Sequence, residues 1–84
     1  MREFRPLYSD LVAEFILTLP KRRQRKLLDV CNQLASNYFI KSDYRIRDAD
    51  GREIEHLLTE GFVIAYWLDY PACKVLIVEV DDVR

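Results

Sequence analysis

The sequence GFVIAYWLDYPACKVLIVEV, residues 61–80, carries the clearest strand pattern in this chain. Residues 62–69 are rich in aromatic and β-branched side chains, and alternate side chains face opposite ways along a strand. Tyr70, Pro71 and Ala72 mark a turn. Residues 73–80 follow as a second strand, and their segment 75–78, Val-Leu-Ile-Val, is typical of a strand buried on both faces. We therefore predict two strands joined by a tight turn.

Two further strands are expected before this stretch. In residues 44–48 and 52–59 the side-chain pattern has a period of two, which is typical of strands. Asp50-Gly51 lies between them, and this pair tolerates the positive φ of a tight hairpin turn. Glu60-Gly61 marks the next turn. Because every connection is short, the four strands are predicted to form an antiparallel meander.

The N-terminal half has helical spacing instead. Residues 9–18 predict a short helix with Ser9 or Asp10 as its N-cap, and Pro20 ends it. Residues 21–38 predict a longer helix with one apolar stripe of Leu27, Leu28, Cys31, Leu34, Ala35 and Tyr38. The prediction is a single α+β domain over residues 1–84, in which an antiparallel helical hairpin packs on a three- or four-stranded antiparallel sheet.

Composition narrows the function classes. The 84 residues include 13 Lys+Arg and 14 Asp+Glu, for a net charge of −1, which argues against a strongly basic nucleic-acid-binding domain. We expect a cytoplasmic protein, because no apolar run is long enough for a membrane span or a signal peptide. Cys31 and Cys73 are expected to be free thiols. No metal-ligand spacing or phosphate-binding loop is present, so no cofactor is expected.

Basic residues gather at two places. Lys21, Arg22, Arg23, Arg25 and Lys26 crowd the start of the predicted long helix, where the helix dipole disfavours cations. The run is either a solvated face or a contact for a partner, and Arg22, Arg25 and Lys26 are the candidate nucleic-acid contacts.

The second basic group lies on the predicted hairpin. Arg45 and Arg47 are candidate nucleic-acid contacts as well, and with Arg52 they would form a small cationic patch. Glu53 and Glu55 lie close enough to neutralise it, so a surface ladder of ion pairs is the default expectation.

One face of the predicted sheet has no element left to cover it. We predict that Val63, Trp67, Val75 and Ile77 form an uncovered apolar patch that binds a protein partner or a second copy of the chain. The alternative is that the N-terminal arm, residues 1–7, folds over this face.

Catalytic candidates are few. His56 is the only histidine, and a single histidine on an apolar strand is more often structural than catalytic. Arg52 and Arg84 complete the set of weak candidates.

The order of elements resembles the RelE/ParE superfamily of bacterial type II toxins. The matching segments lie along most of the chain: Leu19-Pro20-Lys21, Leu27-Leu28, Leu34-Ala35, Tyr44-Arg45-Ile46-Arg47, Gly61-Phe62-Val63-Ile64-Ala65-Tyr66 and Val75-Leu76-Ile77-Val78. The resemblance implies a cognate antitoxin that holds the toxin inactive. It also implies one of two activities: RelE-like members cut messenger RNA on the ribosome, whereas ParE-like members inhibit DNA gyrase.

The residues depart from the ribonuclease pattern. Val63 stands where RelE-like enzymes commonly have a basic residue, and Asp81 and Asp82 stand near the end, where a second one is common. Carboxylates there would repel a phosphate. Three hypotheses follow: a toxin-like protein that acts by protein binding or is inactive, a ribosome-dependent ribonuclease, and a non-toxic interaction or homodimer module.

Overall fold

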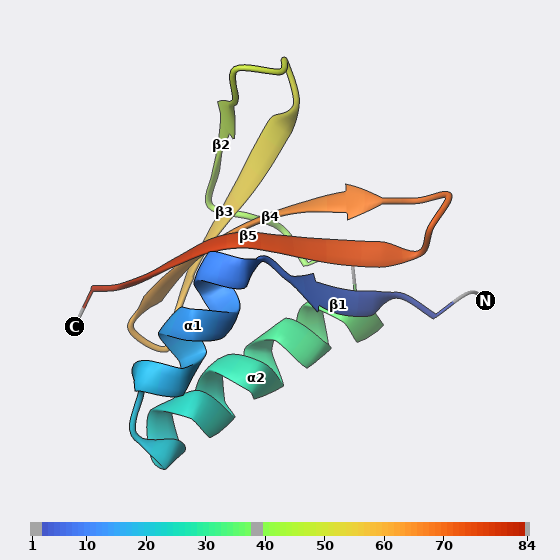
Figure 1. The fold of residues 1–84 in the computed structure, drawn as a ribbon. Helices are drawn as coiled ribbons and strands as arrows, with labels where there is room; N and C mark the ends of the chain where they lie inside the picture. Colours follow the sequence, from blue (N-terminus) through green and yellow to red (C-terminus); the bar gives the residue numbers. More distant parts are fainter. Residues whose placement is uncertain (1–2, 38–39, 84) are drawn as a thin grey trace.

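The computed structural model describes residues 3–37 and 40–83, which form two layers (Figure 1). Both helices lie on one face of a single sheet. The elements in chain order are β1 (Arg5–Tyr8), α1 (Asp10–Thr18), α2 (Lys21–Ser36), β2 (Tyr44–Arg47), β3 (Glu53–Thr59), β4 (Phe62–Asp69) and β5 (Lys74–Asp82). The α+β class and the four predicted strands are confirmed.

The sheet has five strands, one more than predicted. Their order is β1-β5-β4-β3-β2, and all neighbours are antiparallel except β1 and β5, which are parallel. The extra strand, β1, is four residues long and contains Pro6, which an edge strand tolerates because its missing N–H can face away from the ladder. Residues 5–8 therefore extend the sheet beside β5, and the alternative in which the arm of residues 1–7 folds over the uncovered face is wrong for this part of the arm.

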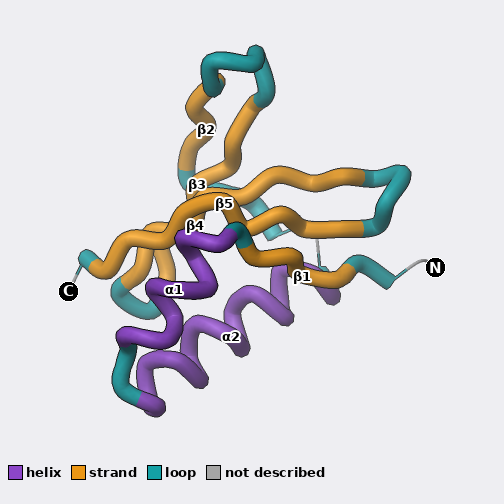
Figure 2. The backbone as a smooth tube through the Cα atoms, viewed as in Figure 1, coloured by secondary structure: helices purple, strands orange, loops and turns teal. Residues whose placement is uncertain are grey.

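Both helices begin within one residue of their predicted starts, but only α1 has a side-chain cap. The side chain of Ser9 accepts a hydrogen bond from the Val12 amide at 3.2 Å and so caps α1. In contrast, α2 follows Pro20 without any side-chain cap. It ends at Ser36, and the predicted end at Tyr38 lies outside the described residues. The β2–β3 hairpin projects beyond both helices (Figure 2).

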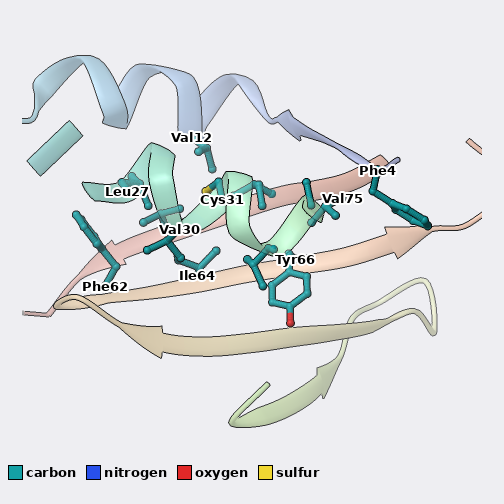
Figure 3. Close-up of a cluster of buried hydrophobic side chains, with 13 residues drawn as sticks. Phe4, Val12, Leu27, Val30, Cys31, Phe62, Ile64, Tyr66 and Val75 are labelled. Atoms are coloured by element: carbon teal, nitrogen blue, oxygen red, sulfur yellow. The ribbon is translucent and has the colours of Figure 1, made fainter. Parts of the chain in front are cut away.

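The core lies between the helices and the sheet (Figure 3). Leu27, Cys31, Phe62, Ile64 and Ile77 are all fully buried in it. Burial of each Leu, Ile or Phe side chain among them contributes about 1.5–3 kcal/mol to folding. The core therefore fixes which face of β4 and β5 is turned toward the helices.

A β-bulge in β5 changes which residues of this strand face the helices. Ala65 pairs with Glu79 but Tyr66 pairs with Ile77, so Val78 is an extra residue in β5. Val80 therefore reaches the core together with Ile77, despite the odd spacing between them. Simple alternation along β5 cannot describe this strand.

The core also contains two linked titratable groups. Burial raises the pKa of Cys31 to about 12, although a hydrogen bond with Tyr8 opposes the shift. Burial, reinforced by Cys31, raises the pKa of Tyr8 to about 12 as well. Both shifts favour the protonated, neutral form in the folded chain.

We expect the free energy of unfolding to fall as the pH rises. Both folded pKa values exceed the ordinary values of 9.0 for Cys31 and 10.0 for Tyr8, so the unfolded chain loses these protons first. The stabilisation is complete below pH 9.0 and is lost by about pH 12. Urea unfolding at a series of pH values measures the effect. In Cys31→Ala the decline should begin nearer pH 10.0, and a decline identical to that of the original chain would contradict the assignment.

Candidate interaction face

The face of the sheet opposite the helices has no described element over it (Figure 1). We call it the open face. Side chains of directly paired residues lie on the same face of a sheet. The pairs on the open face are Trp67–Leu76, Ala65–His56, Val63–Leu58, Tyr44–His56 and Ile46–Ile54. Its outer members are well exposed: Ile46 is 53 % exposed and Leu58 is 52 % exposed. The open face is thus predominantly apolar and aromatic.

A hollow of about 280 Å³ lies within the open face. Its apolar lining comes mainly from β2, β3 and β4, while the β5 bulge brings Val78 and Glu79 to its rim. Its charged lining residues are Arg52, Asp48 and Glu79. Carboxylates therefore outnumber cations around this hollow.

Two stacked pairs fix the aromatic side chains of the open face. The guanidinium of Arg52 lies 4.1 Å from the ring centre of Trp67. The rings of Tyr44 and His56 stack with centroids 4.6 Å apart and an interplanar angle of 11°. The open face is therefore preorganised, which lowers the conformational entropy that a partner must overcome on binding.

His56 has a polar contact that orients its ring. Its Nδ1 lies 3.1 Å from the Ile54 carbonyl oxygen, which can only accept, so this contact is a hydrogen bond when Nδ1 carries a proton. His56 and Arg52, both predicted as weak catalytic candidates, line the same hollow, whereas Arg84 lies outside the described residues.

The predicted partner patch is half right in position. Val63 and Trp67 lie on the open face. Val75 and Ile77 are fully buried against the helices, so their predicted place on the uncovered face is wrong. The physical reason is the register of β5: Trp67 pairs with Leu76, which puts Leu76 on the open face and Val75 on the opposite one. Sequence reasoning missed Leu76, Tyr44 and Glu79, because both faces of β5 are apolar and pairing partners are not visible in a single strand.

Arg45 and Arg47 form the expected ladder of ion pairs. Arg45 Nε lies 2.9 Å from Glu55 Oε1, and Arg47 Nη2 lies 3.5 Å from Glu53 Oε1. The hydrogen bond and charge of Glu55 raise the pKa of Arg45. The ladder lies on the helix-side face of the hairpin, where Tyr66 has a pKa of about 12, raised first by burial and then by Glu55.

Arg23 is buried, unlike the rest of the basic run. Its Nη1 donates to the Glu60 carbonyl oxygen at 2.7 Å, and its Nη2 lies 3.2 Å from the Asp82 carboxylate. The guanidinium also lies 4.0 Å from the ring centre of Phe62. Arg23 therefore joins α2 to the β3–β4 turn and to the end of β5. The sequence gives no sign of this, since the partners are far away along the chain.

Residues 3–37 and 40–83 contain no group of three or more His, Cys, Asp or Glu side chains placed to hold a metal ion. No described helix is long and apolar enough to cross a membrane.

Comparisons with known proteins identify the fold. No family model matches the sequence, and no curated protein matches it either. Among solved structures, the chain is similar to one from the archaeal RelE-RelB complex of Pyrococcus horikoshii OT3, with a TM-score of 0.75 and 12% identity over 96% of both chains. It is also similar to one from the toxin-antitoxin complex RelBE2 of Mycobacterium tuberculosis, with a TM-score of 0.74 and 14% identity over 95% of this chain and 90% of that one. The chain therefore has the fold of RelE.

Proposed function

We propose that this chain is the toxin-like component of a toxin–antitoxin pair and acts by binding a protein target. The observation that carries the proposal is the RelE fold, which matches over nearly the whole of both chains in two toxin–antitoxin structures. The antitoxin would be a separate protein, encoded beside this one. The proposal also requires a surface to which a protein can bind. The open face meets this requirement, because it is a preformed apolar surface with aromatic side chains.

The charges of the open face favour protein binding over RNA cleavage. Cleavage through the 2′-hydroxyl needs cations aimed at the phosphate in addition to a proton acceptor. Arg52 is the cation in the described lining of the hollow, and it is stacked on Trp67. Asp48 and Glu79 border the same hollow, and Asp81 pairs with Val63 further along the face. A phosphodiester would meet repulsion there.

Ribosome-dependent cleavage of messenger RNA remains the second candidate function. The observation that favours it is the presence of His56, Glu79 and Arg52 around one hollow, since an imidazole and a carboxylate are the usual pair for general acid–base catalysis and a guanidinium can contact the phosphate. Trp67 and Tyr44 would offer stacking surfaces for bases.

Induced expression in a bacterial host separates these functions. The proposal predicts growth arrest with intact messenger RNA, and relief of the arrest when the neighbouring gene is co-expressed. Growth arrest with cleaved messenger RNA would show that the chain acts as a ribonuclease instead. Unimpaired growth would contradict a toxic activity and leave an inactive relative or an assembly module.

A further inference from the structure

Five basic residues lie within the first two turns of α2. Neither an acidic residue in the first turn nor a side-chain cap offsets their charge. The helix dipole disfavours cations at this end, and Lys21–Arg25 and Arg22–Lys26 are like-charged pairs four residues apart. This arrangement is electrostatically unfavourable in the isolated chain, so an anionic partner would stabilise it.

Two of the five cations already have partners. Lys26 Nζ lies 3.2 Å from Glu60 Oε2, and Arg23 is held by Asp82 and by the Glu60 carbonyl oxygen. The other three, Lys21, Arg22 and Arg25, are exposed and make no ion pair with any residue that the structure describes. Three positive charges are therefore available to a ligand.

A hollow of about 440 Å³ lies beside these residues. It is lined by Arg22, Arg23, Lys26, Pro20 and Glu60. The buried Nε of Arg23 has no hydrogen-bond partner in the described part of the chain. The amides of the first helical turn are additional donors at this end of α2. The hollow is thus lined mainly by cationic side chains, with one carboxylate, Glu60, which is already paired with Lys26.

We propose that this surface, formed by Lys21, Arg22, Arg25, Lys26 and the adjoining hollow, binds the phosphodiester backbone of a nucleic acid. Guanidinium forks and helix N-terminal amides both match phosphate oxygens in geometry. The cations extend over about 7.5 Å of helix axis, which suits a run of phosphates better than one isolated anion. The surface belongs to the helix layer, apart from the open face, and the inference does not depend on the proposed function.

Fluorescence anisotropy with a short labelled single-stranded RNA and a short labelled DNA duplex, over a range of salt concentrations, tests the site. The variant R22Q/R25Q removes two exposed charges from the surface. The matched control R45Q/R47Q removes two exposed arginines that are already paired with Glu53 and Glu55. We expect the first variant to lose at least about tenfold in affinity and roughly 1.4–1.8 in the slope of log K against log salt. The control should stay close to the original chain.

The outcomes are distinct. Loss confined to R22Q/R25Q with RNA, with duplex DNA or with both supports the site and identifies its ligand. The inference is overturned if the original chain binds neither probe, if both double variants weaken binding equally, or if a polyglutamate of equal charge competes as well as the nucleic acid. Circular dichroism of both variants controls for folding, which neither exposed pair should affect.

Discussion

Replacement of Arg23 by methionine is expected to lower the free energy of unfolding by about 2–4 kcal/mol. The guanidinium makes a charge-assisted hydrogen bond to the Glu60 carbonyl oxygen at 2.7 Å and an ion pair with Asp82 at 3.2 Å. Methionine fills the space over Phe62 but supplies neither donor. The Asp82 side chain is 34% exposed and regains water, which keeps the loss below that of a fully buried pair.

Lys26→Met is the matched control for this prediction. It also removes an ion pair of 3.2 Å from the same end of α2, but both side chains are 47% exposed. An exposed pair of this kind contributes about 0–1 kcal/mol. Urea unfolding of both variants measures the difference. Equal losses would show that the contacts of Arg23 add no more than a surface ion pair.

Replacement of Trp67 by alanine is expected to weaken partner binding by at least about 2 kcal/mol, close to thirtyfold. Trp67 lies on β4, the middle strand of the sheet, beside the hollow and against Arg52. A large aromatic side chain in such a place is the usual anchor of a protein interface. Its cost to folding should be smaller than that of Phe62→Ala, because Trp67 is half-buried whereas Phe62 is fully buried.

Calorimetric titration with the protein encoded beside this gene measures the loss. Leu17→Ala is the control, since Leu17 is 79% exposed on α1, in the helix layer. If Leu17→Ala weakens binding as much as Trp67→Ala, the partner does not use the open face in particular.

Much of the fold follows from local chemistry. Ser9 caps α1 through its own side chain, and Gly51 takes the positive φ of 81° that the β2–β3 turn requires. Glu60 and Gly61, at φ 52° and 79°, make the next turn. These residues act within a few positions of themselves, which is why the strand and helix bounds could be predicted within one or two residues.

The remaining features depend on pairing between distant segments. β1 is short and has no alternation of its own, and it becomes a strand only because β5 offers an edge. The inward side of β5 is chosen by its register with β4 and by the bulge at Val78, not by the hydrophobicity of its residues. Alternation along the sequence therefore predicts the wrong face for Val75 and Ile77 and the right face for Trp67 and Val63.

In the candidate site, too, some features follow from residue type and others only from the fold. Trp67, His56 and Arg52 could be named from residue type, but their convergence on one hollow could not, because it requires the order of β2, β3, β4 and β5. Arg23 illustrates the reverse case. Its place in a run of basic residues indicates an exposed side chain, and only the fold reveals that it is buried.

A protein partner that covers the open face would change the surroundings of Trp67, which is the only tryptophan in the sequence. The measurement is the fluorine NMR spectrum of this chain, labelled with 5-fluorotryptophan, during titration with the unlabelled protein encoded beside it. We expect the single resonance to move to a new position as the complex saturates. If the complex forms while the resonance stays in place, the partner does not cover the open face.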